Sequence, residues 1–321
     1  AAELGSREVP GSSPGGPTTS LASHGNLLRQ GFSGPPGMGK LTAYLRLARI
    51  DHGAIAAIAT AVGCAVGAGG WLLIPSAAVI AVLVAVLVEV GLFALNDVFN
   101  LDEDRVNAPD RPLVRGEVSV DEAVRLGVAS LALGVIISAI LGPAPLLVVA
   151  LAAASGTAYN AWLKRTGLPG NVVVALDTSL PFLFGATVVR GFDVPPLAAV
   201  FVLIAFTATL GREVLKGIRD LEGDLRAGIR TLAATRGVRA ASLVAAALLL
   251  AAPLLSLAAL PLMYDELKCT LYTGLVAATD FLFAYSGASI LLEPSREVAE
   301  SGRRLTLVGM LLGTLAFASA A

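Results

Sequence analysis

Apolar runs of about 20 residues recur along the chain from Leu41 onward, and short breaks rich in Gly, Pro or charge separate them. A helix of that length is what crosses the hydrocarbon core of a bilayer. The composition agrees, because 55% of the 321 residues are hydrophobic, only 15% are charged and the mean hydropathy is +0.77. This balance argues against a soluble enzyme and a disordered chain, and it predicts an all-α polytopic membrane protein.

The runs predict nine transmembrane helices around a central polar cavity, with helical caps on the cytoplasmic side. The predicted spans are 51–74, 76–98, 121–141, 144–163, 170–189, 196–216, 239–260, 268–291 and 304–320. If the tight breaks at 74–76 and 141–144 were bends within single helices, the count would fall to seven or eight. With nine spans, nearly all Lys and Arg residues of the breaks share one face, and only Arg190 and Lys268 fall on the other. The basic face is predicted to be cytoplasmic, with the N-terminus inside and the C-terminus outside.

Residues 1–39 differ from the rest of the chain, because they are rich in Gly, Ser and Pro and show no sustained hydrophobic period. We predict a flexible N-terminal tail there and a nine-helix domain over residues 40–321. The net charge of −1 argues against a nucleic-acid partner, so the expected surroundings are the lipid bilayer of the cell membrane.

The first chemically informative segment is NDVFNLDEDR, residues 96–105, at the cytoplasmic end of the second predicted span. Asn96, Asn100 and Asp104 follow an i, i+4, i+8 spacing, which predicts three oxygen-bearing side chains on one helix face. Asp97 is adjacent to this face, and Glu89 lies two turns deeper in the span. Because a carboxylate inside a bilayer is costly, these residues are expected to face a polar cavity or a partner.

A second segment with the same spacing follows the sixth predicted span. Lys216, Asp220 and Asp224 again lie at i, i+4 and i+8, on the same predicted side of the membrane as the first segment. Two carboxylate faces that meet across a cavity would form an all-oxygen site suited to Mg²⁺ and to the phosphates of a substrate. The alternative is a pair of solvated cytoplasmic loops with ordinary juxtamembrane charge.

Three stretches of the sequence resemble the UbiA superfamily of intramembrane prenyltransferases. Residues 96–116, NDVFNLDEDRVNAPDRPLVRG, resemble its first motif, NDxxDxxxD followed by Arg-Pro and a Gly, and residues 212–231 resemble its second, DxxxD. Residues 159–164, YNAWLK, are similar to the Tyr and Lys between the motifs. The second stretch is most similar to archaeal-type digeranylgeranylglyceryl phosphate synthases. One departure stands out, because Asn100 occupies the place of the family's middle acid and brings no charge to a metal.

The resemblance implies a nine-helix fold and a role for each matching residue. The implied Mg²⁺ ligands are Asn96, Asn100, Asp104, Asp220 and Asp224. The implied catalytic residues are Asp97, Asp104, Asp220, Asp224 and Lys164. The implied substrate contacts are Arg49, Tyr159, Asn160, Lys216 and Glu89. Asp102 is out of register with the ligand face and is not expected to replace Asn100.

The reaction implied is Mg²⁺-dependent transfer of a long, geranylgeranyl-type prenyl group from its diphosphate to a membrane-associated acceptor. The acceptor most in keeping with the resemblance is geranylgeranylglyceryl phosphate, which would place the enzyme in ether-lipid synthesis. Two alternatives stay open at this point. One is an aromatic acceptor such as 4-hydroxybenzoate, and the other is a secondary transporter, since intramembrane acids also suit an ion pathway.

Overall fold

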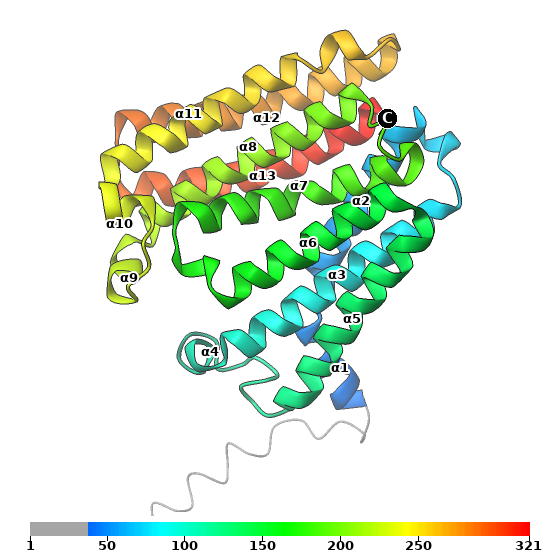
Figure 1. Ribbon diagram of the computed structural model, residues 1–321. Helices are drawn as coiled ribbons and strands as arrows, with labels where there is room; N and C mark the ends of the chain where they lie inside the picture. The colour runs from blue at the N-terminus through cyan, green and yellow to red at the C-terminus, as the bar shows by residue number, and fades with distance from the viewer. Residues whose placement is uncertain (1–37) are drawn as a thin grey trace, which may run out of the picture. The chain divides into compact units, whose positions relative to one another are not determined.

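The computed structural model describes residues 38–321, so the predicted tail lies almost entirely outside the described residues. The chain divides into two units, residues 1–41 and 42–321, and the second holds almost all of the helices (Figure 1). The helices are α1 (Met38–Leu47), α2 (Ile50–Ala68), α3 (Ala77–Phe99), α4 (Leu101–Asn107), α5 (Val120–Leu141), α6 (Pro143–Ala161), α7 (Leu168–Arg190), α8 (Pro196–Arg219), α9 (Leu221–Arg226), α10 (Leu232–Arg236), α11 (Val238–Leu257), α12 (Glu266–Leu292) and α13 (Arg296–Ala320). Short 3₁₀ turns at Trp71–Leu73 (η2), Leu163–Arg165 (η3) and Leu260–Leu262 (η4) join some of them. The described part of the chain contains no strand, which confirms the all-α prediction.

Nine long helices in the described residues, α2, α3, α5–α8 and α11–α13, lie where the sequence predicts spans. Seven of them are long and apolar enough to cross a membrane, and α1 with α2 would make an eighth, bent by 54° between its halves. Of the nine long helices, α13 alone is not a candidate span, because its first half carries charged residues that include Glu300, Arg303 and Arg304. The chain is therefore a multi-pass membrane protein with seven or eight candidate spans, and the count of nine stays a prediction.

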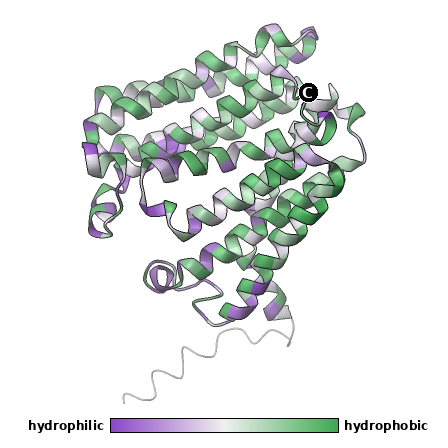
Figure 2. Ribbon diagram, viewed as in Figure 1, coloured by the Kyte–Doolittle hydropathy of each residue, from purple (hydrophilic) through white to green (hydrophobic). Residues whose placement is uncertain are grey.

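The unit of residues 42–321 contains two groups of four long helices that pack in the same order. In the first group α2 packs on α3, α3 on α5 and α5 on α6, and in the second α7 packs on α8, α8 on α11 and α11 on α12. The two groups meet chiefly where α2 crosses α7, and α6 and α3 also contact α7; α13 packs against α8 and α12. Both α3 and α8 run toward the end of the unit that carries α4 and α9 (Figure 1). Polar residues gather at that end, whereas apolar residues cover the long helices (Figure 2).

Two glycines allow α2 and α7 to approach closely. A Cβ on Gly63 would lie 2.1 Å from the carbonyl oxygen of Phe182, and a Cβ on Gly185 would lie 2.1 Å from that of Thr60. Membrane helices associate through van der Waals packing, so small residues at a crossing bring the two backbones together. The crossing that joins the two helix groups therefore depends on these two positions.

We expect Gly185→Ala to destabilise the protein by about 3 kcal/mol or more, because the added methyl group meets backbone that cannot rotate away. The matched control is Gly274→Ala on α12, where an added Cβ meets nothing within 4 Å. The control should be neutral or slightly stabilising, since Ala favours a helix over Gly by roughly 1 kcal/mol. Thermal unfolding of the two variants in detergent measures the difference. Equal melting temperatures would show that the α2–α7 crossing tolerates a wider separation.

Candidate functional site

The first acidic motif lies where α3 bends into α4. Asn100 forms the bend with φ −103° and ψ 10°. The backbone N–H of Asn100 still donates to the carbonyl of Asn96 at 3.0 Å, and the N–H of Asp104 donates to the carbonyl of Asn100 at 2.8 Å. The i, i+4, i+8 spacing predicts one helix face for these three residues; the helical hydrogen bonds connect all three, while the helix is divided into α3 and α4 at the middle one.

The second motif has the same construction at the end of α8. Asp220 forms the bend into α9 with φ −90° and ψ 5°. Its N–H donates to the carbonyl of Lys216 at 2.9 Å, and the N–H of Asp224 donates to the carbonyl of Asp220 at 2.9 Å. Each motif thus places its middle residue at a bend and its last acid on a short helix at the polar end of the unit.

Asp97 and Asp104 are joined by one arginine from the segment after α4. Asp97 is only 3% exposed, and its Oδ1 accepts from Nη2 of Arg49 at 2.9 Å and from Nη1 of Arg111 at 2.9 Å. The same Nη1 of Arg111 also donates to Oδ2 of Asp104. Arg49 sits at the break between α1 and α2 with a left-handed φ of 44°, and its guanidinium lies 4.6 Å from the ring centroid of Phe93. The two buried acids are therefore neutralised by two arginines held in fixed positions.

Lys164 reaches the bend of the first motif from η3. Its Nζ donates to Oδ1 of Asn100 at 2.8 Å and to Oε2 of Glu103 at 2.5 Å. Arg165 donates to the other oxygen of Glu103 at 2.6 Å. The hydrogen bond from Lys164 is the main reason that the pKa of Glu103 lies below its usual value. These contacts place a lysine ammonium group directly beside the first motif.

Asn160 connects the first motif to α6. Its Oδ1 accepts from Nδ2 of Asn96 at 2.8 Å, and its own Nδ2 donates to the carbonyl of Leu92 at 3.0 Å. Tyr159 is the preceding residue on the same helix. Asn160 therefore fixes the end of α6 against the first motif.

Glu89 lies deeper in α3 than the motif. It lies within electrostatic reach of Asp177 on α7, and Asp177 accepts a hydrogen bond of 2.6 Å from the hydroxyl of Ser155. The structure therefore groups Glu89 with an acid on α7, deeper along α3 than the motif residues described above.

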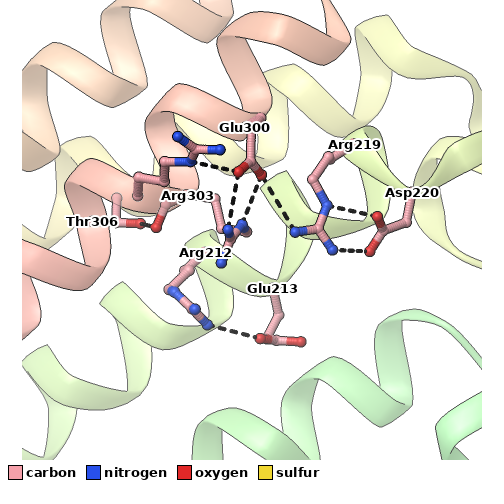
Figure 3. A network of polar contacts seen from close by, with 8 residues as sticks. Arg212, Glu213, Arg219, Asp220, Glu300, Arg303 and Thr306 are labelled. Atoms are coloured by element: carbon pink, nitrogen blue, oxygen red, sulfur yellow. Dashed lines mark hydrogen bonds and ion pairs between the residues drawn. The ribbon is translucent and has the colours of Figure 1, made fainter. Parts of the chain in front are cut away.

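The carboxylate of Asp220 is held by its neighbour in the chain (Figure 3). Nε and Nη2 of Arg219 donate to its two oxygens at 2.6 and 2.5 Å, while Nη1 of Arg219 reaches Glu300 on α13 at 3.3 Å. Asp224 lies one turn further, and partial burial, followed by the negative charge of Asp220, raises its pKa. The second motif therefore holds two carboxylates close enough to repel each other.

Lys216, a predicted substrate contact, is paired within its own helix. Its Nζ lies 3.3 Å from Oε2 of Glu213, and Nη1 of Arg212 lies 3.3 Å from the other oxygen of Glu213. Glu213 is 6% exposed and faces the interior of the unit. Figure 3 shows the contact between Arg212 and Glu213 on the same side of α8 as the Arg219–Asp220 pair.

Several residues that make these contacts have no role predicted from the sequence, namely Glu103, Arg111, Glu213, Arg219 and Glu300. Of these, only Arg111 belongs to a recognisable sequence pattern, since it is the Arg of the Arg-Pro pair that follows the first motif. Asp102 was expected to point away from the ligand face, and its side chain is 92% exposed and paired with Arg105.

The comparisons with known proteins agree on one family. Residues 56–296 match the sequence model of the UbiA prenyltransferase family. A digeranylgeranylglyceryl phosphate synthase from Metallosphaera sedula is 38% identical over 278 residues, which cover 87% of this chain and 95% of the relative. A synthase with the same name from Ignicoccus hospitalis is 36% identical over 288 residues, covering 86% of this chain and 91% of the relative.

Solved structures give the same result for the fold. A structure concerned with digeranylgeranylglyceryl phosphate synthase in membranes aligns with a TM-score of 0.76 at 26% identity, covering 87% of this chain and 97% of that one. A UbiA homolog from Archaeoglobus fulgidus bound to GPP and Mg²⁺ aligns with a TM-score of 0.65 at 21% identity, covering 86% and 99%. At that identity the second likeness concerns the fold alone.

Proposed function

Because the chain belongs to the UbiA prenyltransferase family and is a membrane prenyltransferase, we propose that it transfers a geranylgeranyl-type group from its diphosphate to geranylgeranylglyceryl phosphate. The observation that carries this proposal is the pair of bent acidic motifs, each with cations in contact, at one end of the unit. The names of the relatives in two archaea support the choice of acceptor. The excess of Lys and Arg in the breaks at that end supports a cytoplasmic site.

The residues of the two motifs fit Mg²⁺ that is bound together with a diphosphate. Among residues 38–321 no group of three or more His, Cys, Asp or Glu could hold a metal alone. The first motif nevertheless offers one carboxylate, Asp104, and the second offers two, and Mg²⁺ in proteins takes one or two carboxylates and completes its shell with water and substrate phosphates. The proposed ligands are Asn96, Asn100, Asp104, Asp220 and Asp224. When bound, the metal would offset the negative charge that develops on the leaving diphosphate.

The chain's own cations would share that task. Lys164 and Arg49 both lie at the first motif and carry donors for phosphate oxygens. Asp97 would act indirectly, because its carboxylate fixes the positions of Arg49 and Arg111. We propose substrate contacts for Tyr159, Asn160 and Lys216 near the motifs and for Glu89 deeper along α3.

In the proposed reaction one C–O bond breaks and another forms. The C–O bond between the allylic carbon and diphosphate breaks, and the electron pair leaves with diphosphate. The acceptor hydroxyl attacks the allylic cation, a new ether C–O bond forms and the hydroxyl proton is released. The apolar helices around the site would keep water from the cation, which would otherwise give the free alcohol.

A product assay tests the proposal. Purified protein is incubated with geranylgeranyl diphosphate, Mg²⁺ and either geranylgeranylglyceryl phosphate or 4-hydroxybenzoate, and the products are identified by mass spectrometry. We expect the ether lipid and an equal amount of diphosphate from the first acceptor only, with loss of both when EDTA removes the metal. Transfer to 4-hydroxybenzoate alone would overturn the acceptor, and undiminished transfer in EDTA would overturn the metal.

A further inference from the structure

Four arginines gather between α8 and α13, beside the second motif (Figure 3). We call Arg212, Arg219, Arg303 and Arg304 the α8–α13 arginine cluster. Glu300 lies at its centre, 3.3 Å from Nη1 of Arg219, 2.9 Å from Nε of Arg303 and 2.6 Å from Nε of Arg304. One carboxylate thus serves three guanidinium groups. Arg219 is also held by Asp220, and Arg303 donates to Glu300 from both Nε and Nη2, so the unused donors lie mainly on Nη1 of Arg303 and on the terminal nitrogens of Arg304.

Close packing between the two helices fixes the arrangement. A Cβ on Gly302 would lie 3.1 Å from Cδ1 of Leu215, so α13 approaches α8 at the turn that carries Glu300 and Arg303. Three of the four arginine side chains are 19–25% exposed, and only Arg304, at 74%, extends into solvent. The cluster is therefore a preformed, partly desolvated surface at which charge-assisted hydrogen bonds are strong.

The charges of the cluster do not balance. With Lys216 the four arginines bring five positive charges, against four carboxylates, Glu213, Asp220, Glu300 and the adjacent Asp224. The positive charge in excess favours an anion, and a phosphate monoester carries roughly −1.5 to −2 at neutral pH. In addition, Nε of Arg212 is buried and has no hydrogen-bond partner among the described residues. A buried guanidinium N–H without an acceptor is costly, and an anion in the cluster would supply one.

The position of the cluster separates it from the proposed diphosphate site. The cations that serve that site come from the break between α1 and α2 and from η3, whereas the cluster is built on α8 and α13. The two lie close together, since Arg219 holds Asp220 of the second motif. A prenylated glyceryl phosphate has its reacting hydroxyl and its phosphate on the same glycerol. Its phosphate must therefore bind within a glycerol's length of the transferred carbon, next to the motifs and not on them.

We propose that Arg212, Arg219 and Arg303 bind the phosphate monoester of the prenyl acceptor and so select a phosphorylated lipid over a neutral or aromatic one. The inference rests on the proposed function for the identity of the acceptor. It adds the residues that recognise the acceptor and a reason for the preference. Arginine suits this role, because its planar fork binds two phosphate oxygens at once.

Arg303→Gln is the informative variant. Glu300 keeps Arg219 and Arg304 in this variant, so no buried acid is left without a partner. We expect the KM for geranylgeranylglyceryl phosphate to rise at least tenfold and the KM for geranylgeranyl diphosphate to stay within twofold. Arg303→Lys, which keeps the charge but loses the fork, should show a smaller rise. Arg296→Gln removes the same charge from an exposed position on the same helix and should leave both KM values unchanged.

A binding measurement makes the test independent of turnover. Wild-type protein should melt at a higher temperature with geranylgeranylglyceryl phosphate than with the same lipid lacking its phosphate, and Arg303→Gln and Arg212→Gln should lose this difference. Inorganic phosphate at the same concentration shows whether the lipid is needed. A rise in the KM for the diphosphate substrate alone, or wild-type behaviour of both variants, would overturn the inference. Absence of transfer in the wild type, with the melting difference intact, would overturn the proposed function and leave the phosphate site standing.

Discussion

Asp224→Ala should lower kcat by about a thousandfold or more, equivalent to ~4 kcal/mol in activation free energy. Asp224 is the last acid of the second motif, one helical turn beyond Asp220, and the two carboxylates repel each other in the structure. A divalent cation between them and a diphosphate would relieve that repulsion and offset the charge on the leaving group. The loss of one carboxylate removes this arrangement, whereas the fold should persist because Asp224 lies on the short α9 outside the packed helices.

The matched control is Asp102→Ala on the other short helix, α4. Its side chain is 92% exposed and pairs only locally with Arg105, so kcat should change less than twofold. Diphosphate release at several Mg²⁺ concentrations, with both variants at equal thermal stability, gives the comparison. If Asp102→Ala proved as damaging as Asp224→Ala, the assignment of the ligand face in the first motif would be wrong. If Asp224→Ala kept wild-type turnover at low Mg²⁺, the second motif would not hold a metal.

The long helices could be predicted from the sequence because a bilayer imposes a minimum apolar length on each of them. α3, α5 and α12 begin and end within a few residues of the predicted spans. The bends at Asn100 and Asp220 could not be predicted, since i, i+4 spacing fits a straight helix equally well. The backbone hydrogen bonds continue through both bends, and neither bend contains a proline that would mark it in the sequence.

The acidic residues of the site could be predicted from the sequence, whereas most of the residues that pair with them could not. Carboxylates at helical spacing near the end of an apolar run are conspicuous, because they are rare inside membranes. Several of their cations come from elsewhere in the chain: Arg49 lies 48 residues before Asp97, and Lys164 lies 61 residues after Glu103. Contacts between segments so far apart depend on which helices become neighbours. No hydrophobic period encodes that choice, and for this reason the α8–α13 arginine cluster appears only in the folded structure.

Arg111→Met, in the loop after α4, should destabilise the protein by about 3 kcal/mol. Arg111 contacts both Asp97 and Asp104, whose side chains are 3% and 10% exposed. Its removal leaves Asp97 with Arg49 alone and leaves Asp104 without the arginine that it shares with Asp97. A buried charge that has lost its partner is costly, and this cost exceeds what the pair contributes when it is intact. Arg105→Met, which breaks an exposed pair with Asp102, should cost less than about 1 kcal/mol.

The double variant Arg111→Met with Asp104→Asn distinguishes the loss of charge balance from the loss of side-chain packing. If the uncompensated carboxylate causes the instability, removal of its charge should restore most of the free energy of unfolding, measured by denaturant titration in detergent. The rescued protein should still turn over slowly, because Asp104 is also a proposed metal ligand. Rescue of stability without rescue of activity would show two things. The buried carboxylate of Asp104 is stable in the fold only when Arg111 pairs with it, and the reaction requires that carboxylate. A double variant as unstable as Arg111→Met alone would instead assign the arginine a packing role, with its long stem rather than its charge supporting the loop against α3.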